Sequence, residues 1–77
     1  MAESLKQKEF NFLKQNIIDF VASKEEGYSI KIIIDYLDFK NKVLYDETTI
    51  KLILEELISQ KKISENNGIY FIADELN

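Results

Sequence analysis

The side chains of this 77-residue chain that could carry acid–base or metal chemistry are mainly carboxylates. There are 14 Asp and Glu residues, but there is no His, the commonest general base, and no Cys to supply a thiolate. The carboxylates show no repeated spacing typical of a metal cage, and no segment has the glycine turn of a calcium loop. "ENNGIY" at 65–70 has one glycine and no phosphate-cradling motif. We therefore predict a protein that is not an enzyme, with no metal, cofactor or small-molecule substrate.

Charge is distributed unevenly along the chain. Residues 1–45 hold seven Lys and seven acids, whereas residues 46–77 hold three Lys and seven acids, so the net charge of −4 lies in the second half. All basic residues are Lys, because the chain has no Arg. An acidic surface attracts basic partners and repels nucleic acid, so this asymmetry indicates a basic partner.

Length and composition predict one domain over residues 1–77, with 1–4 and 74–77 frayed. A chain of this size buries only about 60% of the surface it exposes when unfolded, which leaves room for one core. Hydrophobic residues make up 45% and charged residues 31%, as in ordinary globular domains. No apolar run has the length of a signal peptide or a membrane span. We expect an intracellular protein without membrane association, nuclear in a eukaryote and cytoplasmic otherwise.

The apolar spacing predicts three helices. The first runs from Ser4 to about Lys24, with an apolar face of Phe10, Leu13, Ile17, Phe20 and Val21, and Gly27 ends it. The second starts at the N-cap Ser29 and reaches Phe39, with Ile30, Ile33, Ile34 and Leu37 on one face. Its three consecutive isoleucines would also suit a strand, but the flanking Lys31 and Asp35 favour a helix.

The third helix has the clearest pattern and runs from about Glu47 to Gln60. Asp46 or Thr48 caps it, and its buried stripe consists of Ile50, Ile53, Leu54, Leu57 and Ile58. Two β-prone runs then flank Asn66, Asn67 and Gly68, a strong hairpin signal. The favoured register pairs Ile63 near Tyr70 or Ile72 and turns Ile69 and Phe71 outward; a loop one residue different would reverse the faces.

The order of elements predicts an α+β fold of the winged-helix type: three helices, a C-terminal β-hairpin wing and a short strand near Tyr28. Two segments carry a closer resemblance: Gly27-Tyr28-Ser29-Ile30 with Ile33 and Leu37, and "TTIKLILEELISQKKI" at 48–63. In these segments the chain resembles, within the winged-helix superfamily, the C-terminal domain of the middle subunit of replication protein A and related telomere-complex subunits. Two features depart from that family: the stretch from Asp38 to Tyr45 is longer, and Lys61 and Lys62 replace acidic or neutral residues.

This resemblance implies a module that docks partly basic amphipathic helices of replication, repair, telomere or transcription proteins. The predicted binding surface combines acidic residues that orient the partner with apolar residues of the wing: Glu55, Glu56, Glu65, Ile69 and Phe71.

The alternative is a small DNA-binding transcription regulator that reads duplex DNA with the third helix and the wing. Its candidate residues are Thr48, Thr49, Lys51, Lys61 and Lys62. The absence of Arg argues against it, since Arg is the better of the two side chains for reading guanine.

Some apolar residues lie opposite the predicted core faces and need another partner. These are Leu5 and Phe12 on the first helix, and Ile32, Tyr36 and Phe39 on the second. For Leu5 and Phe12 we favour an interface with a partner or with a second copy in a homodimer. For the second helix we favour an internal explanation, in which Val43, Leu44 and Tyr45 fold over it.

Overall fold

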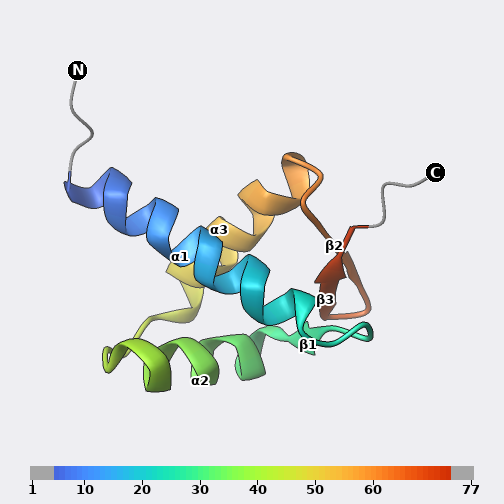
Figure 1. The fold of residues 1–77 in the computed structure, drawn as a ribbon, viewed down its shortest axis with the longest axis horizontal. Coiled ribbons are helices and arrows are strands. Elements are labelled where there is room, and N and C mark those ends of the chain that lie inside the picture. The colour runs from blue at the N-terminus through green and yellow to red at the C-terminus, as the bar shows by residue number, and fades with distance from the viewer. Residues whose placement is uncertain (1–4, 74–77) are drawn as a thin grey trace.

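The computed structural model describes residues 5–73, with side chains from Gln7 onward, and forms a small α+β domain (Figure 1). Three helices and three strands follow one another in the order α1, β1, α2, α3, β2, β3. The frayed ends predicted at residues 1–4 and 74–77 lie outside the described residues. None of the helices in the part of the chain that is described has the length and apolarity to cross a membrane.

Helix α1 (Leu5–Ala22) buries the face that its apolar spacing predicts. Leu13, Ile17 and Val21 are buried, and Phe10 and Phe20 pack against them from the edges. The helix ends slightly before the predicted Lys24. Ser23 brings this about, because its backbone N–H and its hydroxyl both donate to the Phe20 carbonyl, at 3.0 and 2.6 Å.

Helix α2 (Ile30–Asn41) confirms the helical interpretation of the isoleucine run. Ser29 is the N-cap, and its hydroxyl accepts the Ile32 N–H at 3.5 Å. Ile33 and Leu37 are buried, while Ile30 and Ile34 pack against the core. The helix continues two residues past Phe39 and ends at Lys42, whose φ of 56° is left-handed.

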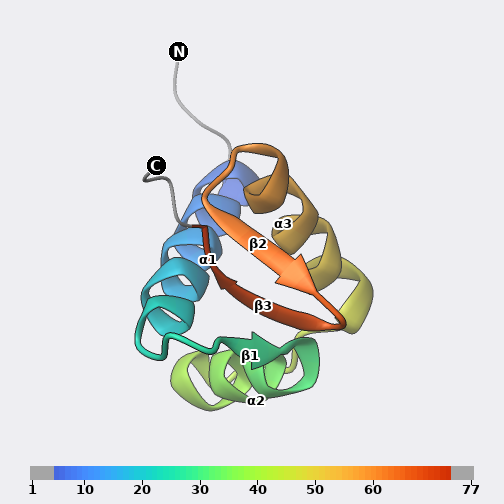
Figure 2. The same ribbon diagram turned by 90° about the vertical axis from the view of Figure 1, so that its right-hand side faces the viewer.

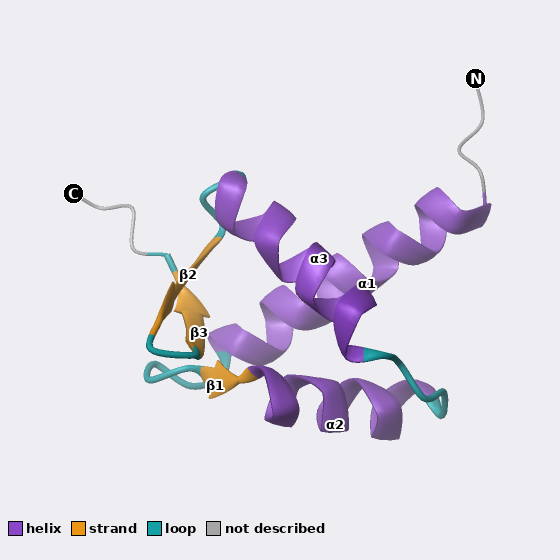
Figure 3. Ribbon diagram, turned by 180° about the vertical axis from the view of Figure 1, so that it is seen from behind, coloured by secondary structure: helices purple, strands orange, loops and turns teal. Residues whose placement is uncertain are grey.

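On the second face of α2, Tyr36 is covered within the domain, but by α1 and not by the predicted connection. The Phe20 ring lies between Tyr28 and Tyr36, with centroid distances of 4.1 and 3.9 Å, so Tyr36 is covered by α1. The α2–α3 connection does not fold over α2 as predicted (Figure 3). Tyr45 packs against the core and its N–H donates to Asp38 Oδ1 at 3.0 Å, and this turns Val43 and Leu44 to solvent.

Helix α3 (Glu47–Ser59) buries Ile50, Ile53, Leu54 and Leu57 of its predicted stripe, and Ile58 is half-buried against the core. Asp46 is the N-cap, but its side chain does not bond to a backbone amide; it accepts the Thr49 hydroxyl at 2.9 Å instead. At the other end, Lys61 N–H donates to the Ile58 carbonyl and Lys62 N–H to the Leu57 carbonyl. These two bonds form a Schellman motif, in which Lys61 takes the left-handed position (φ 62°) usually held by glycine.

The sheet consists of β1 (Tyr28–Ser29), β2 (Ile63–Asn66) and β3 (Ile69–Ile72), all antiparallel, with β3 in the centre. Asn67 and Gly68 form the turn between β2 and β3 with φ angles of 53° and 82°, as a type I′ hairpin requires. This two-residue turn pairs Ile63 with Ile72 and settles the register.

The helices cover one face of the sheet and leave the other face open (Figure 2). Ile63 and Tyr70 point to the helices and complete the core, and Ile69 faces outward, as predicted. Gly27 allows the turn after α1 to approach β3. Its φ is +83°, and a Cβ atom there would collide with the Tyr70 carbonyl and lie 2.8 Å from Phe71 Cβ.

Candidate functional site

Three carboxylates from two elements act electrostatically on the Tyr70 side chain. Burial raises the pKa of the Tyr70 hydroxyl above its ordinary value, and the negative charges of Glu65, Glu55 and Glu47 raise it further. Glu47 and Glu55 lie on α3, and Glu65 lies on β2. All three are exposed. We call Glu47, Glu55 and Glu65 the acidic face.

The hairpin itself fixes the position of Glu65. Its Oε2 atom accepts the Gly68 N–H at 2.7 Å, so the carboxylate is held at the turn. Among the described residues, neither Glu47 nor Glu55 forms an ion pair, although Lys51 lies one helical turn from each. Lys51 offsets only part of the negative charge of the three carboxylates, so this surface keeps a net negative charge.

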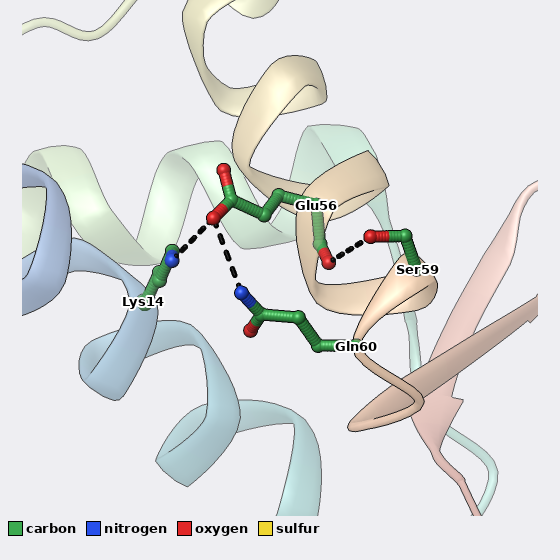
Figure 4. Close-up of polar contacts among 4 residues, drawn as sticks. All are labelled: Lys14, Glu56, Ser59 and Gln60. Carbon is green, nitrogen blue, oxygen red and sulfur yellow. Dashed lines mark hydrogen bonds and ion pairs between the residues drawn. The ribbon is translucent and has the colours of Figure 1, made fainter.

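Glu56 does not belong to this face, which corrects the predicted grouping of Glu55 with Glu56. Its Oε2 atom lies 2.7 Å from Lys14 Nζ on α1 and accepts Gln60 Nε2 at 3.1 Å (Figure 4). Adjacent helical residues point about 100° apart, so one glutamate faces α1 while the other points away from it. Glu56 thus joins α1 to α3.

The predicted apolar part of the site is separated from its acidic part. Ile69 and Phe71 lie on the open face of the sheet, whereas Glu65 is paired directly with Tyr70 and shares its face. Ile69 is 36% exposed, and Phe71 is half-buried beside the Gly27 turn. Of these two residues, Ile69 is next to the turn that holds Glu65, so it alone borders the acidic face.

The residues of the DNA alternative are dispersed along α3. Thr48 and Thr49 lie in its first turn and Lys61 and Lys62 just after its end, about 20 Å apart at the rise of an α-helix. Thr49 already donates its hydroxyl to Asp46. Lys51 is flanked by carboxylates at both neighbouring helical turns. The structure therefore does not collect these lysines into one basic surface.

The candidate interface residues on α1 and α2 have different outcomes. Phe12 is 53% exposed, and Ile32 and Phe39 are also exposed. Tyr36 lies in the aromatic stack. The Leu5 side chain, predicted to act with Phe12, lies outside the described residues.

A groove between α1 and α3 was not found from the sequence. It encloses about 670 Å³, and its lining includes apolar residues and two carboxylates: Phe10, Leu13, Tyr45, Leu52, Glu9 and Glu56. The exposure of Leu52 on the third helix was the available signal. The groove itself depends on how α1 crosses α3, which no local pattern specifies.

Within residues 5–73, no group of three or more His, Cys, Asp or Glu side chains is arranged to hold a metal ion. Comparisons with protein-family models, with curated proteins and with solved structures gave no match for this chain.

Proposed function

We propose that this domain is a winged helix, in which α2 and α3 form the helix-turn-helix pair and β2–β3 the wing. The order of elements supports this, as does the position of β3 between β1 and β2. The short strand at Tyr28–Ser29 also agrees with the strand predicted near Tyr28. Since this fold hosts several functions, the function has to be argued from the surface.

We propose that the domain is a non-enzymatic interaction module that binds a partly basic amphipathic helix of a protein partner. The partner would belong to a DNA replication, repair, telomere or transcription assembly, as the resemblance implies. The observation that carries the proposal is the acidic face, because the negative charges of three exposed carboxylates on α3 and β2 all act on one tyrosine. Convergent negative charge steers and orients a basic partner.

The positions of the carboxylates change the set of residues that we propose for this contact. Glu47, Glu55 and Glu65 meet the basic side of the partner helix, and Ile69 at the end of the wing contacts its apolar side. Glu47 takes the place of Glu56 in this set because the Glu56 carboxylate points to Lys14 on α1 and is not among the charges that act on Tyr70. Duplex DNA is the poorer ligand for this surface, since its phosphates would face the same three carboxylates.

The test is fluorescence anisotropy with a labelled synthetic helical peptide that has Leu along one side and Lys and Arg along the other. The variant Glu55→Lys/Glu65→Lys should weaken peptide binding about tenfold or more. The matched control is Glu25→Lys/Glu26→Lys, which changes the net charge equally on exposed residues of the turn after α1. The control should change binding much less.

Equal weakening by both variants would show that only net charge matters and would contradict the assigned surface. The DNA alternative is tested by titrating a labelled random-sequence DNA duplex with the protein at roughly 50 mM and roughly 200 mM salt. Duplex binding that is lost at the higher salt, together with no peptide binding, would replace the proposal by the DNA-binding one.

A further inference from the structure

Two large apolar side chains near the end of α2 are almost fully exposed. Phe39 is 84% exposed and Leu44 is 89% exposed, and they lie five residues apart around the end of the helix. Val43 between them is also exposed. We call Phe39, Val43 and Leu44 the apolar knob. Exposed apolar clusters of this kind usually mark interfaces.

The knob is held in place by its neighbours along the chain. Tyr45, next to Leu44, packs on the core and donates its N–H to Asp38 Oδ1 at 3.0 Å. Lys42 closes α2 in the left-handed conformation. A rigid protruding side chain loses little conformational entropy on binding, and this favours its use as an anchor.

The groove between α1 and α3 is complementary to the knob in polarity. Phe10, Leu13, Tyr45 and Leu52 provide apolar surface, and Leu52 is 58% exposed. Its volume of about 670 Å³ is sufficient for several side chains.

Charge complementarity points to the same occupant. The knob is interspersed with Lys40 and Lys42, both exposed, and the groove carries Glu9 and Glu56. Glu56 uses Oε2 for its contacts with Lys14 and Gln60 and keeps Oε1 clear of them (Figure 4). An incoming lysine can therefore pair with Glu56 without displacing Lys14.

Knob and groove are neighbours on one molecule. Tyr45 lines the groove and directly follows Leu44, and Figures 1 and 3 show the first half of α1 and the α2–α3 connection at the same end of the domain. Two adjacent complementary surfaces can meet twice across a two-fold axis, which closes the assembly at two copies.

We propose that the occupant of the groove is a second copy of this chain, so that each knob enters the groove of the other copy. Lys40 and Lys42 then face Glu9 and Glu56 across the interface. The proposal does not depend on the acidic face, because the knob and the groove use none of Glu47, Glu55 and Glu65. It differs from the predicted helix-one dimer, since it uses neither Leu5 nor Phe12.

Sedimentation equilibrium of the full chain tests the proposal. From roughly 1 μM to roughly 1 mM, the mass should rise from the 9.1 kDa monomer toward twice that value. Phe39→Ser/Leu44→Ser on the knob, and Leu52→Lys in the groove, should each raise the dimer dissociation constant at least tenfold. The matched control Phe12→Ser removes an exposed apolar residue of α1 that does not line the groove, and it should leave the constant unchanged. Circular dichroism confirms that each variant is folded.

Exchanging charges across the interface distinguishes this dimer from nonspecific hydrophobic association. Lys40→Glu/Lys42→Glu should weaken the dimer, and adding Glu9→Lys to the same chain should recover part of the lost affinity. A monomer at every concentration would overturn the proposal. So would a dimer that the knob variants leave intact, or one that Phe12→Ser weakens equally.

Discussion

Glu65 lies directly opposite Tyr70 in the pairing of β2 with β3. The carboxylate is held by the Gly68 N–H at 2.7 Å, and the tyrosine is buried against the helices. Cross-strand partners share one face of a sheet, so the negative charge of Glu65 acts on the tyrosine hydroxyl. The hydroxyl thus serves as an internal probe of the acidic face.

Replacing the carboxylates of this face should lower the pKa of Tyr70. Burial is the first cause of the raised pKa and is unaffected, but Glu65→Gln and Glu55→Gln each remove a negative charge that disfavours the phenolate. Alkaline absorbance titration, with Tyr70→Phe subtracted to isolate this residue among the four tyrosines, measures the change. Glu56→Gln is the control and should have little effect.

The raised pKa of Tyr70 also makes stability decrease at high pH. The folded state holds the phenolic proton more tightly than the unfolded state, whose ordinary pKa is 10.0. This contribution is fully present below pH 10.0 and is lost as the pH rises from there through the higher pKa of the folded state. Urea unfolding across this range should show a smaller decline for Tyr70→Phe, and an equal decline would contradict the assignment.

Gly27→Ala should destabilise the domain far more than Gly68→Ala. Both glycines have φ angles above +80°, but a Cβ at Gly27 meets the Tyr70 carbonyl, whereas one at Gly68 meets nothing within 4 Å. Backbone strain alone predicts about 1–2 kcal/mol for Gly68→Ala, and the added overlap predicts roughly 2–5 kcal/mol for Gly27→Ala. Urea unfolding measures both losses; equal losses would show that the close approach is absent in solution.

Lys61→Gly should stabilise the domain. Lys61 holds the left-handed position of the Schellman motif, where a side chain costs about 1–2 kcal/mol and glycine is unstrained. The larger entropy of an unfolded glycine offsets part of this, so we expect a net gain of about 0.5–1 kcal/mol. Lys62→Gly removes the same charge without relieving strain, and its unfolding midpoint should fall rather than rise.

Lys14 and Glu56 should be energetically coupled. The pair joins α1 to α3 at 2.7 Å and the Lys14 side chain is largely buried, so a double-mutant cycle with Lys14→Met and Glu56→Gln should give about 0.5–1 kcal/mol. The coupling should decrease with added salt. A control cycle with Lys14→Met and Glu55→Gln should give little coupling, because these two residues form no ion pair. An equally large coupling there would contradict the pairing of Lys14 with Glu56.

Features of the fold with a local cause were predictable from the sequence. Ser29 caps α2 because its own hydroxyl reaches the next turn, and Asn67-Gly68 forms the hairpin because both residues tolerate positive φ. The apolar stripes of the helices are also buried as predicted. Each of these signals depends on residues that are close in the chain, so it can be recognised in a single amino-acid sequence.

The candidate site was less predictable because it depends on how distant elements pack. The amino-acid sequence does not distinguish the roles of the neighbouring residues Glu55 and Glu56. They differ because Lys14 on α1 pairs with Glu56 alone. The left-handed backbone conformation of Lys61 was not predictable, because no glycine occupies that position. The α1–α3 groove likewise arises from a helix crossing that no short stretch encodes.

The central position of β3 has a consequence for how this chain acquires its structure. Residues 69–72 pair with both β1 and β2, and β1 does not pair with β2. Every interstrand hydrogen bond of the sheet therefore requires β3, the last strand. The pairing of Tyr28 with Tyr70 closes a loop of more than half the chain. During synthesis the three helices leave the ribosome before any sheet can form. A chain shortened before residue 69 has no partial sheet to retain.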